Sequence, residues 1–135
     1  MPPPKGRILC TEDDADTREL LVCLLEESDY MVTVSESSED ALALAKSEQF
    51  DLLLVDNWMP GLSGEELTRE IRKFDRSTPI LFYSGAAFES DKQGARDAGA
   101  QGYLVKPEGI TVLITEVARL IAEAKDRSVA VGTSH

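Results

Sequence analysis

Short apolar runs alternate along the chain with segments in which apolar residues recur at helical spacing. A short apolar run between turn-forming residues is typical of a buried strand, and helical recurrence is typical of a helix with one buried face. The runs predict strands at residues 8–11, 30–34, 52–55, 80–84 and 102–106. The recurrences predict helices around residues 20–25 and at residues 38–49, 63–74, 90–98 and 111–125.

This alternation predicts one α/β domain with a parallel sheet. Strands that alternate with helices need right-handed crossovers, which place helices on both faces of the sheet. The glycine fingerprints of dinucleotide- and phosphate-binding loops are absent from the sequence. We expect a flavodoxin-like (βα)5 three-layer sandwich with strand order 2-1-3-4-5. The domain should span residues 7–125, between an N-terminal arm (residues 1–6) and a C-terminal tail or linker start (residues 126–135).

The ends and faces of the helices can also be predicted. Asp14 or Asp16 should cap the first helix, Ser63 the third and Gly99 the C-terminal end of the fourth. The apolar faces are expected to include the leucines at residues 20–25 and, on the third helix, Phe74.

Composition narrows the class of protein. A formal net charge of −11 disfavours nonspecific nucleic-acid binding, which needs basic residues to displace counterions. No apolar run approaches the ~20 residues of a membrane span, and the start lacks the apolar core of a signal peptide. We therefore expect a cytoplasmic protein without membrane insertion. Cys10 and Cys23 fall in a strand and a helix, and both are expected to be buried reduced thiols.

Polar residues gather where the predicted strands end. They are Glu12, Asp13 and Asp14 after the first strand, Asp56 after the third, Ser84 at the end of the fourth and Lys106 at the end of the fifth. Each alone would be taken as a turn former, a cap or a solvated side chain. In a doubly wound sheet, however, ligands bind at the carboxyl ends of the strands, beside the point where the strand order reverses. The coincidence predicts a functional site at that edge.

The chemistry of these groups suits phosphoryl transfer. Crowded carboxylates need a cation, and an all-oxygen ligand set favours Mg²⁺ or Mn²⁺ over Zn²⁺. Lys106 and Ser84 would bind the oxygens of a phosphoryl group. Asp56, which ends the central strand, is the candidate nucleophile because carboxylates form acyl phosphates.

Four motifs carry a family resemblance: Glu12-Asp13, the run V-D-N-W-M-P-G-L-S-G at residues 55–64, Ser84-Gly85, and Y-L-V-K-P at residues 103–107. With them the chain resembles, over about residues 7–125, the CheY-like receiver domain of two-component response regulators. Two departures are conservative. Glu12 stands where the family more often has Asp, and Ser84 replaces a commoner Thr while keeping the hydroxyl.

The resemblance implies a role for the acidic residues at the carboxyl ends of the strands and for Trp58. Asp56 would be the phosphoacceptor and a metal ligand. Asp13 would bind Mg²⁺ directly and Glu12 through a water molecule, while the backbone carbonyl of Trp58 would complete the protein's ligands. Trp58 and Ala86 would occupy the two variable positions that help set the lifetime of the acyl phosphate.

The resemblance also implies which residues would act as a conformational switch. Ser84 and Lys106 would bind the phosphoryl oxygens, and Lys106-Pro107 would be a cis peptide bond. Tyr103 would be an aromatic switch that turns inward when Ser84 moves toward the phosphate.

The function implied is a phosphorylation-dependent signalling switch. A histidine kinase or a phosphotransfer protein would donate a phosphoryl group to Asp56, and the surface of the fourth helix, fifth strand and fifth helix would change to control a partner or an attached output or kinase domain. The chain would not be a conventional turnover enzyme, although it would catalyse its own Mg²⁺-dependent phosphorylation and slow dephosphorylation. It would be either a free-standing regulator or the receiver of a hybrid kinase or longer regulator.

Other functions fit less well. A phosphatase of the haloacid dehalogenase type needs a second Asp two residues after the first, where this chain has Trp58. A pseudo-receiver that only binds a partner usually lacks one of the acids or the lysine, and here all are present. A kinase or serine hydrolase would need a suitably placed histidine, and the only one is His135 at the C-terminal end.

Overall fold

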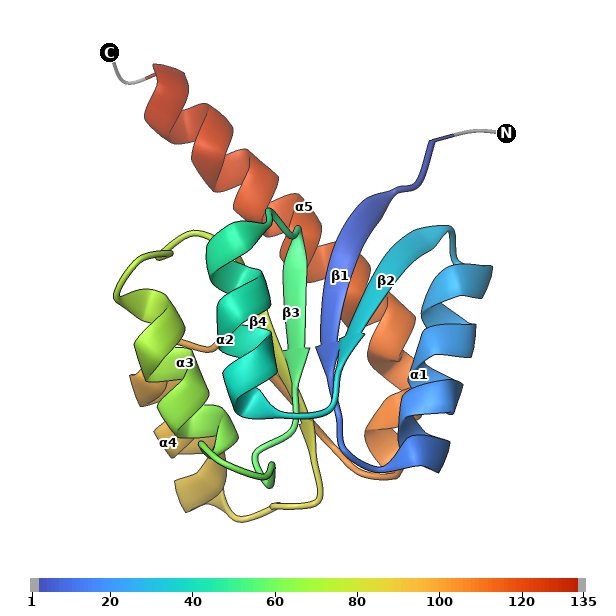
Figure 1. Ribbon diagram of the computed structural model, residues 1–135. Coiled ribbons are helices and arrows are strands. Elements are labelled where there is room, and N and C mark those ends of the chain that lie inside the picture. The colour runs from blue at the N-terminus through green and yellow to red at the C-terminus, as the bar shows by residue number, and fades with distance from the viewer. Residues whose placement is uncertain (1–2, 134–135) are drawn as a thin grey trace.

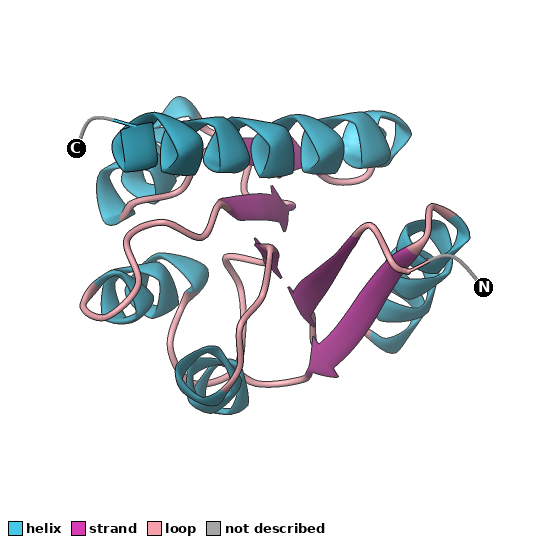
Figure 2. Cartoon of the chain, turned by 90° about the horizontal axis from the view of Figure 1, so that it is seen from above, coloured by secondary structure: helices cyan, strands magenta, loops and turns pink. Residues whose placement is uncertain are grey.

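The computed structural model of the chain describes residues 3–133, with side chains described from residue 3 to residue 127. Within this range five strands form one central sheet, and helices cover both of its faces (Figure 1, Figure 2). The strands are β1 (Gly6–Thr11), β2 (Tyr30–Ser35), β3 (Leu52–Val55), β4 (Ile80–Ser84) and β5 (Gly102–Val105). The helices are α1 (Ala15–Glu27), α2 (Ser38–Ser47), α3 (Gly64–Arg72), α4 (Glu89–Ala98) and α5 (Leu113–Thr133), with the 3₁₀ helix η1 (Glu108–Val112) before α5.

The sheet has the predicted order, β2-β1-β3-β4-β5. All neighbouring strands are parallel, and Leu54 of β3 lies in register with Cys10 of β1 and Leu81 of β4. The expected α/β class and flavodoxin-like order are confirmed. Because the strands are parallel, their carboxyl ends all lie at one edge of the sheet.

Alternate residues of each strand face opposite layers of helices. In β3, Leu52 and Leu54 pack with residues of α1 and α5, whereas Leu53 and Val55 pack with residues of α2, α3 and α4. A strand that is covered on both faces needs an unbroken apolar run, because its side chains alternate between the faces. The strand β3 can therefore carry polar chemistry only at its ends, which is where Asp56 lies.

The last helix is longer than the sequence pattern predicts. Its expected apolar face is buried at Leu113, Val117, Leu120 and Ile121, but the helix continues through residues 126–133, where we expected a tail or linker. No proline interrupts these residues, and adding residues to an existing helix costs little. In Figure 1 this last part of α5 projects beyond the sheet. The use of these residues as a linker stays a prediction, and residues 134–135 lie outside the described range.

Three side chains are more exposed than expected. Leu20 and Phe74 are 48% and 43% exposed, and the thiol of Cys23 is also exposed. On α1, Leu21 faces the core, and Cys23 lies about 200° around the helix from it at about 100° per residue. Cys10 is buried as predicted, and burial raises the pKa of its thiol to about 12.

The end of α4 agrees with its prediction. Gly99 caps this helix with a φ of 121°, which favours glycine. Across the part of the chain that the structure describes, no helix combines the length and the hydropathy required to cross a membrane.

Candidate functional site

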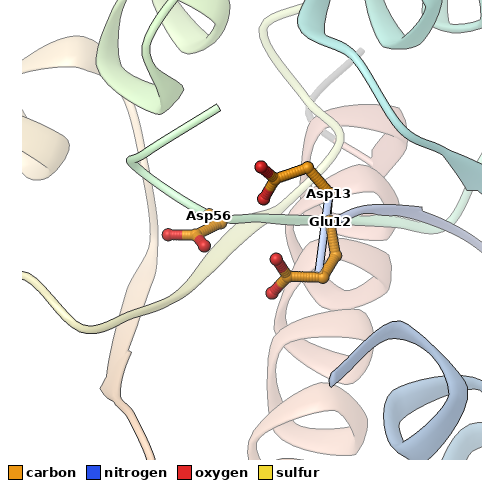
Figure 3. Close-up of side chains that lie close together, drawn as sticks. All are labelled: Glu12, Asp13 and Asp56. Carbon is orange, nitrogen blue, oxygen red and sulfur yellow. The ribbon is translucent and has the colours of Figure 1, made fainter. Parts of the chain in front are cut away.

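Three carboxylates meet at the carboxyl edge of the sheet. Glu12 and Asp13 directly follow β1, and Asp56 directly follows β3, the neighbouring strand (Figure 3). Each offers one oxygen atom, and the three atoms lie within 4.8 Å of one another. Glu12 and Asp56 are buried, at 2% and 5% exposure, whereas Asp13 is exposed. This acidic cluster (Glu12, Asp13 and Asp56) has an all-oxygen donor set that fits a hard divalent cation, and its exposed member faces the solvent from which a cation would enter.

The ammonium of Lys106 joins the two buried members of the acidic cluster. Its Nζ atom donates to Oε1 of Glu12 at 2.7 Å and to Oδ2 of Asp56 at 2.8 Å. Lys106 directly follows β5, at the same edge of the sheet, and its bond to Pro107 is cis, as the resemblance implied.

Burial and hydrogen bonding have opposite effects on the pKa values of Lys106 and Glu12. Burial alone would lower the pKa of Lys106, but its hydrogen bonds to Asp56 and Glu12 outweigh burial and raise the pKa. Burial also raises the pKa of Glu12, and hydrogen bonds from Lys106 and from the Asp14 amide only partly oppose it. Lys106 is therefore a permanent cation at neutral pH.

The loop after β1 is held by the start of α1. Asp14 caps this helix by accepting from the amide of Thr17 at 2.9 Å, and its own amide donates to Oε2 of Glu12 at 3.2 Å. Of the two predicted caps, Asp14 is thus the one used. Arg18 donates from Nη1 to the carbonyl oxygens of Glu12 at 3.0 Å and Asp13 at 3.4 Å. Sequence reasoning missed Arg18, whose place one turn into α1 lets its side chain reach back over the preceding loop.

The loop after β3 begins with a tight turn around Asp56. The amide of Trp58 donates to Oδ1 of Asp56 at 3.2 Å. A Cβ atom at Gly64 would lie 2.6 Å from the Asp56 carbonyl oxygen, so this close approach of α3 requires glycine. The buried Asn57 accepts from the amide of Glu65 at 3.3 Å, and Ser63 caps α3, as predicted. These contacts hold the Asp56 backbone against the first turn of α3.

A buried serine of α2 fixes the middle of the same loop. The hydroxyl of Ser38 donates to the carbonyl oxygen of Pro60 at 2.9 Å and accepts from the amide of Leu62 at 2.7 Å. Ser38 is fully buried. The sequence gives no sign of this role, because it depends on α2 lying beside a loop more than twenty residues further along the chain.

The side chain of Trp58 lies outside the acidic cluster. Its indole is 65% exposed and packs over Gly85, where an added Cβ atom would lie 3.2 Å from a ring carbon. The indole therefore bridges the loops that follow β3 and β4.

Ser84 and Tyr103 meet at the backbone of Ala86. The Ser84 hydroxyl, which is fully buried, accepts from the Ala86 amide at 3.2 Å. The Tyr103 hydroxyl donates to the Ala86 carbonyl oxygen at 2.6 Å, and its ring stacks on Phe82 with centroids 5.5 Å apart. Burial raises the pKa of Tyr103, so its hydroxyl stays protonated as a donor. The two predicted switch residues are thus connected through one loop residue.

Comparisons with known proteins agree with this arrangement. Residues 8–118 match the family model of the response regulator receiver domain. The transcriptional regulatory protein ResD of Bacillus subtilis is 32% identical over 122 residues, which are 90% of this chain and 50% of ResD. PcoR of Escherichia coli, also a transcriptional regulatory protein, is 31% identical over 127 residues, 94% of this chain and 56% of PcoR. The chain thus spans about half the length of the curated relatives it matches.

Solved structures show the same fold. The CheY-like receiver domain protein of Methanospirillum hungatei JF-1 has a TM-score of 0.85 at 26% identity, over 90% of this chain and 97% of that one. The receiver domain of the sensor histidine kinase PA1611 of Pseudomonas aeruginosa PAO1, which has a magnesium ion coordinated in its active site cleft, has a TM-score of 0.80 at 29% identity, over 87% and 98% of the two chains. This chain therefore belongs to the family of response regulator receiver domains, whose members act as phosphorylation-dependent switches of two-component signalling.

Proposed function

We propose that this chain receives a phosphoryl group on Asp56 from a histidine kinase or a histidine phosphotransfer protein. One observation carries the proposal. The buried Asp56 carboxylate lies in the acidic cluster and at the same time accepts a hydrogen bond from Lys106 at 2.8 Å. A nucleophilic carboxylate, ligands for a cation and a fixed positive charge are the parts that phosphoryl transfer requires.

The residues suited to hold a metal ion are the carboxylates of Asp13 and Asp56, the carboxylate of Glu12 through water, and the backbone carbonyl of Trp58. Mg²⁺ or Mn²⁺, when bound there, neutralises the acids and binds phosphoryl oxygens. The magnesium ion in the related receiver domain of PA1611 supports this assignment.

Asp56, Lys106 and Ser84 would each have a separate role in the transfer step. A carboxylate oxygen of Asp56 attacks phosphorus, the new P–O bond forms as the P–N bond of the donor histidine breaks, and the electron pair returns to the imidazole. Lys106 exchanges carboxylate oxygens for phosphoryl oxygens. The Ser84 hydroxyl accepts from the Ala86 amide, and its O–H would turn to donate to the phosphoryl group.

The switch would work through Ala86. Movement of Ser84 toward the phosphoryl group changes its contact with the Ala86 amide, while Tyr103 holds the carbonyl of the same residue. A displacement at Asp56 would thereby reach β5 and the neighbouring surfaces of α4 and α5, which a partner protein or attached domain reads. We place the protein in the cytoplasm, and we regard it as a self-modifying switch that also loses its phosphoryl group slowly.

The test is labelling with acetyl phosphate and Mg²⁺. The wild-type chain should gain one hydroxylamine-sensitive phosphoryl group per molecule, detected by intact mass, whereas Asp56→Asn should gain none. Asp51→Asn, which changes the acid directly before β3, is the matched control and should label normally. An unlabelled wild-type chain, or a labelled Asp56→Asn variant, would contradict the proposal, and the former result would favour a binding module that works without phosphorylation.

A further inference from the structure

The aromatic ring of Tyr83 lies against Lys106, and none of the roles described above uses it. Tyr83 precedes Ser84 in β4 and is 4% exposed, within the core layer between the sheet and the helices α1 and α5. The Nζ atom of Lys106 lies 5.7 Å from the centroid of the ring. A cation within about 6 Å of a ring centroid is attracted by the negative face of the ring. The hydroxyl of Tyr83 makes only a long contact, 3.4 Å, with the carbonyl oxygen of Pro107.

The other partners of this ammonium change during phosphorylation. Its hydrogen bonds go to Glu12 and Asp56, which both belong to the acidic cluster. A cation at the cluster would compete with the ammonium for these two carboxylates, and a phosphoryl group on Asp56 would offer the ammonium other oxygens in their place. The ring of Tyr83 has no such competitor, so its contact with Lys106 can persist before, during and after the transfer.

We propose that the ring of Tyr83 is a positioning element for Lys106, which holds the ammonium in place while it exchanges carboxylate oxygens for phosphoryl oxygens. The proposal rests on the phosphorylation of Asp56 proposed above. Lysine carries its charge on a flexible four-carbon stem, so an ammonium without a fixed contact takes many positions. Misplacement of a charged group near the reacting atoms slows the reaction.

Packing alone does not require an aromatic residue at this position. Tyr83 lies in register with Leu104 of β5, and Leu81, two residues earlier on the same face of β4, is an aliphatic residue in the same core layer. An aliphatic side chain would fill the same space in the core, but it has no negative ring face to attract a cation. The ring is therefore the feature to test.

The experiment compares two variants at the site with one distant control. Tyr83→Leu removes the ring, and Tyr83→Phe keeps the ring but removes the hydroxyl. Tyr30→Leu makes the same change as Tyr83→Leu in the same core layer, at the opposite end of the sheet. We expect Tyr83→Leu to slow labelling by acetyl phosphate at saturating Mg²⁺ by about 3- to 30-fold, because an ammonium that is less well held is less often in the reactive position. Tyr83→Phe and Tyr30→Leu should stay within about twofold of wild type by the same reasoning.

Two readouts separate positioning from a structural defect. The Mg²⁺ affinity of Tyr83→Leu, measured by the fluorescence of Trp58, should be no lower than that of wild type, because a less firmly held Lys106 competes less with the cation for Glu12 and Asp56, whereas a structural defect of the site would lower it. The NMR signals of the Lys106 ε-methylene protons should show a ring-current shift in wild type and Tyr83→Phe that is lost in Tyr83→Leu. A series of increasingly fluorinated phenylalanines at position 83 should lower the labelling rate progressively, because fluorine withdraws charge from the ring face.

The outcomes are distinct. Equal labelling rates for Tyr83→Leu and Tyr30→Leu, or no trend across the fluorinated series, would overturn the role of Tyr83 while leaving the phosphorylation of Asp56 intact. An absence of labelling in wild type would instead overturn the proposed function, and the ring-current shift would still report whether the ring holds Lys106.

Discussion

Lys106 Nζ lies 2.7 Å from Oε1 of Glu12, although 94 positions separate the two residues along the chain. The same ammonium lies 2.8 Å from Asp56, so one lysine is shared by two buried carboxylates. Its side chain is only 22% exposed, which makes its loss costlier than that of a surface lysine. The lysine and a metal ion would thus share the carboxylates of Glu12 and Asp56.

This competition gives a first prediction. In the absence of divalent cations, Lys106→Met should lower the free energy of unfolding in urea by about 1–3 kcal/mol, because two buried carboxylates lose their partner. Added Mg²⁺ should then stabilise Lys106→Met more than wild type. Lys92→Met, which removes a solvent-exposed ion pair with Glu89, should have little effect. Equal stabilisation of Lys106→Met and wild type by Mg²⁺ would show that the lysine and the metal do not compete.

A second prediction concerns Ser38, which fixes the loop after Asp56. Ser38→Ala should lower the free energy of unfolding by about 1–3 kcal/mol, because the buried Ser38 hydroxyl makes two hydrogen bonds, to the backbone of Pro60 and Leu62, that are lost. It should also weaken Mg²⁺ binding by roughly threefold to tenfold, since the loop that carries Trp58 is less well held. Ser47→Ala, on the exposed end of the same helix, is the control and should change neither quantity. Unchanged Mg²⁺ affinity in Ser38→Ala would mean that the loop holds its shape without this serine.

The indole of Trp58 should report on both ligands of the site. It is the only tryptophan, and it packs over Gly85 between two loops of the site. We expect its fluorescence to change on titration with Mg²⁺ and again on addition of beryllofluoride, a phosphoryl mimic. Asp13→Asn should abolish or greatly weaken the first response. A flat signal in both titrations of the wild-type chain would count against the assigned metal ligands.

Removal of one hydroxyl should separate phosphorylation from its readout. Tyr103→Phe keeps the stack on Phe82 but loses the hydrogen bond to the Ala86 carbonyl. Labelling of Asp56 should stay near the wild-type rate, while the chemical-shift changes that beryllofluoride causes in the amides of α4 and β5 should shrink. Stability should fall by about 0.5–1.5 kcal/mol. Unreduced shift changes in α4 and β5 would show that the signal travels by another route.

A last prediction concerns acid stability. Burial alone would raise the pKa of Asp75, but hydrogen bonds from Thr78 and Ser77 outweigh it and hold the pKa below its usual range. A carboxyl group with a lowered pKa stabilises the fold above its unfolded pKa of about 3.9, and this stabilisation is lost as the pH falls through the lower folded value. Asp75→Asn should therefore be less stable than wild type at neutral pH, with a smaller further loss on acidification. Parallel pH profiles of the urea midpoint in the two proteins would refute this account.

The sequence predicts the fold and the acidic cluster because both follow from local pattern and topology. Leu52–Val55 is an unbroken apolar run, which is typical of a strand covered on both faces, and Asp56 stands at its end. Once strands are parallel, the residues that follow β1, β3 and β5 must lie at one edge. That geometric necessity, rather than any single residue, brings Glu12, Asp56 and Lys106 together.

The supporting residues are not predictable in the same way. Ser38, Arg18 and Tyr83 each act on a segment whose nearness is decided by how helices and loops pack, and no spacing along the chain encodes it. The exposure of Cys23 has the same origin, because the direction in which α1 presents each residue depends on the contacts of Leu21 with the sheet.

Ala86 offers both of its peptide groups to the site, an N–H to Ser84 and a carbonyl oxygen to Tyr103. Since every residue except proline supplies these two groups, the proposed link between Ser84 and Tyr103 does not depend on the side chain at position 86. By the family resemblance, that side chain would help set the lifetime of the acyl phosphate, so it could vary without loss of the proposed link. Under this proposal, the lifetime of the signal and its transmission would depend on different groups of one residue.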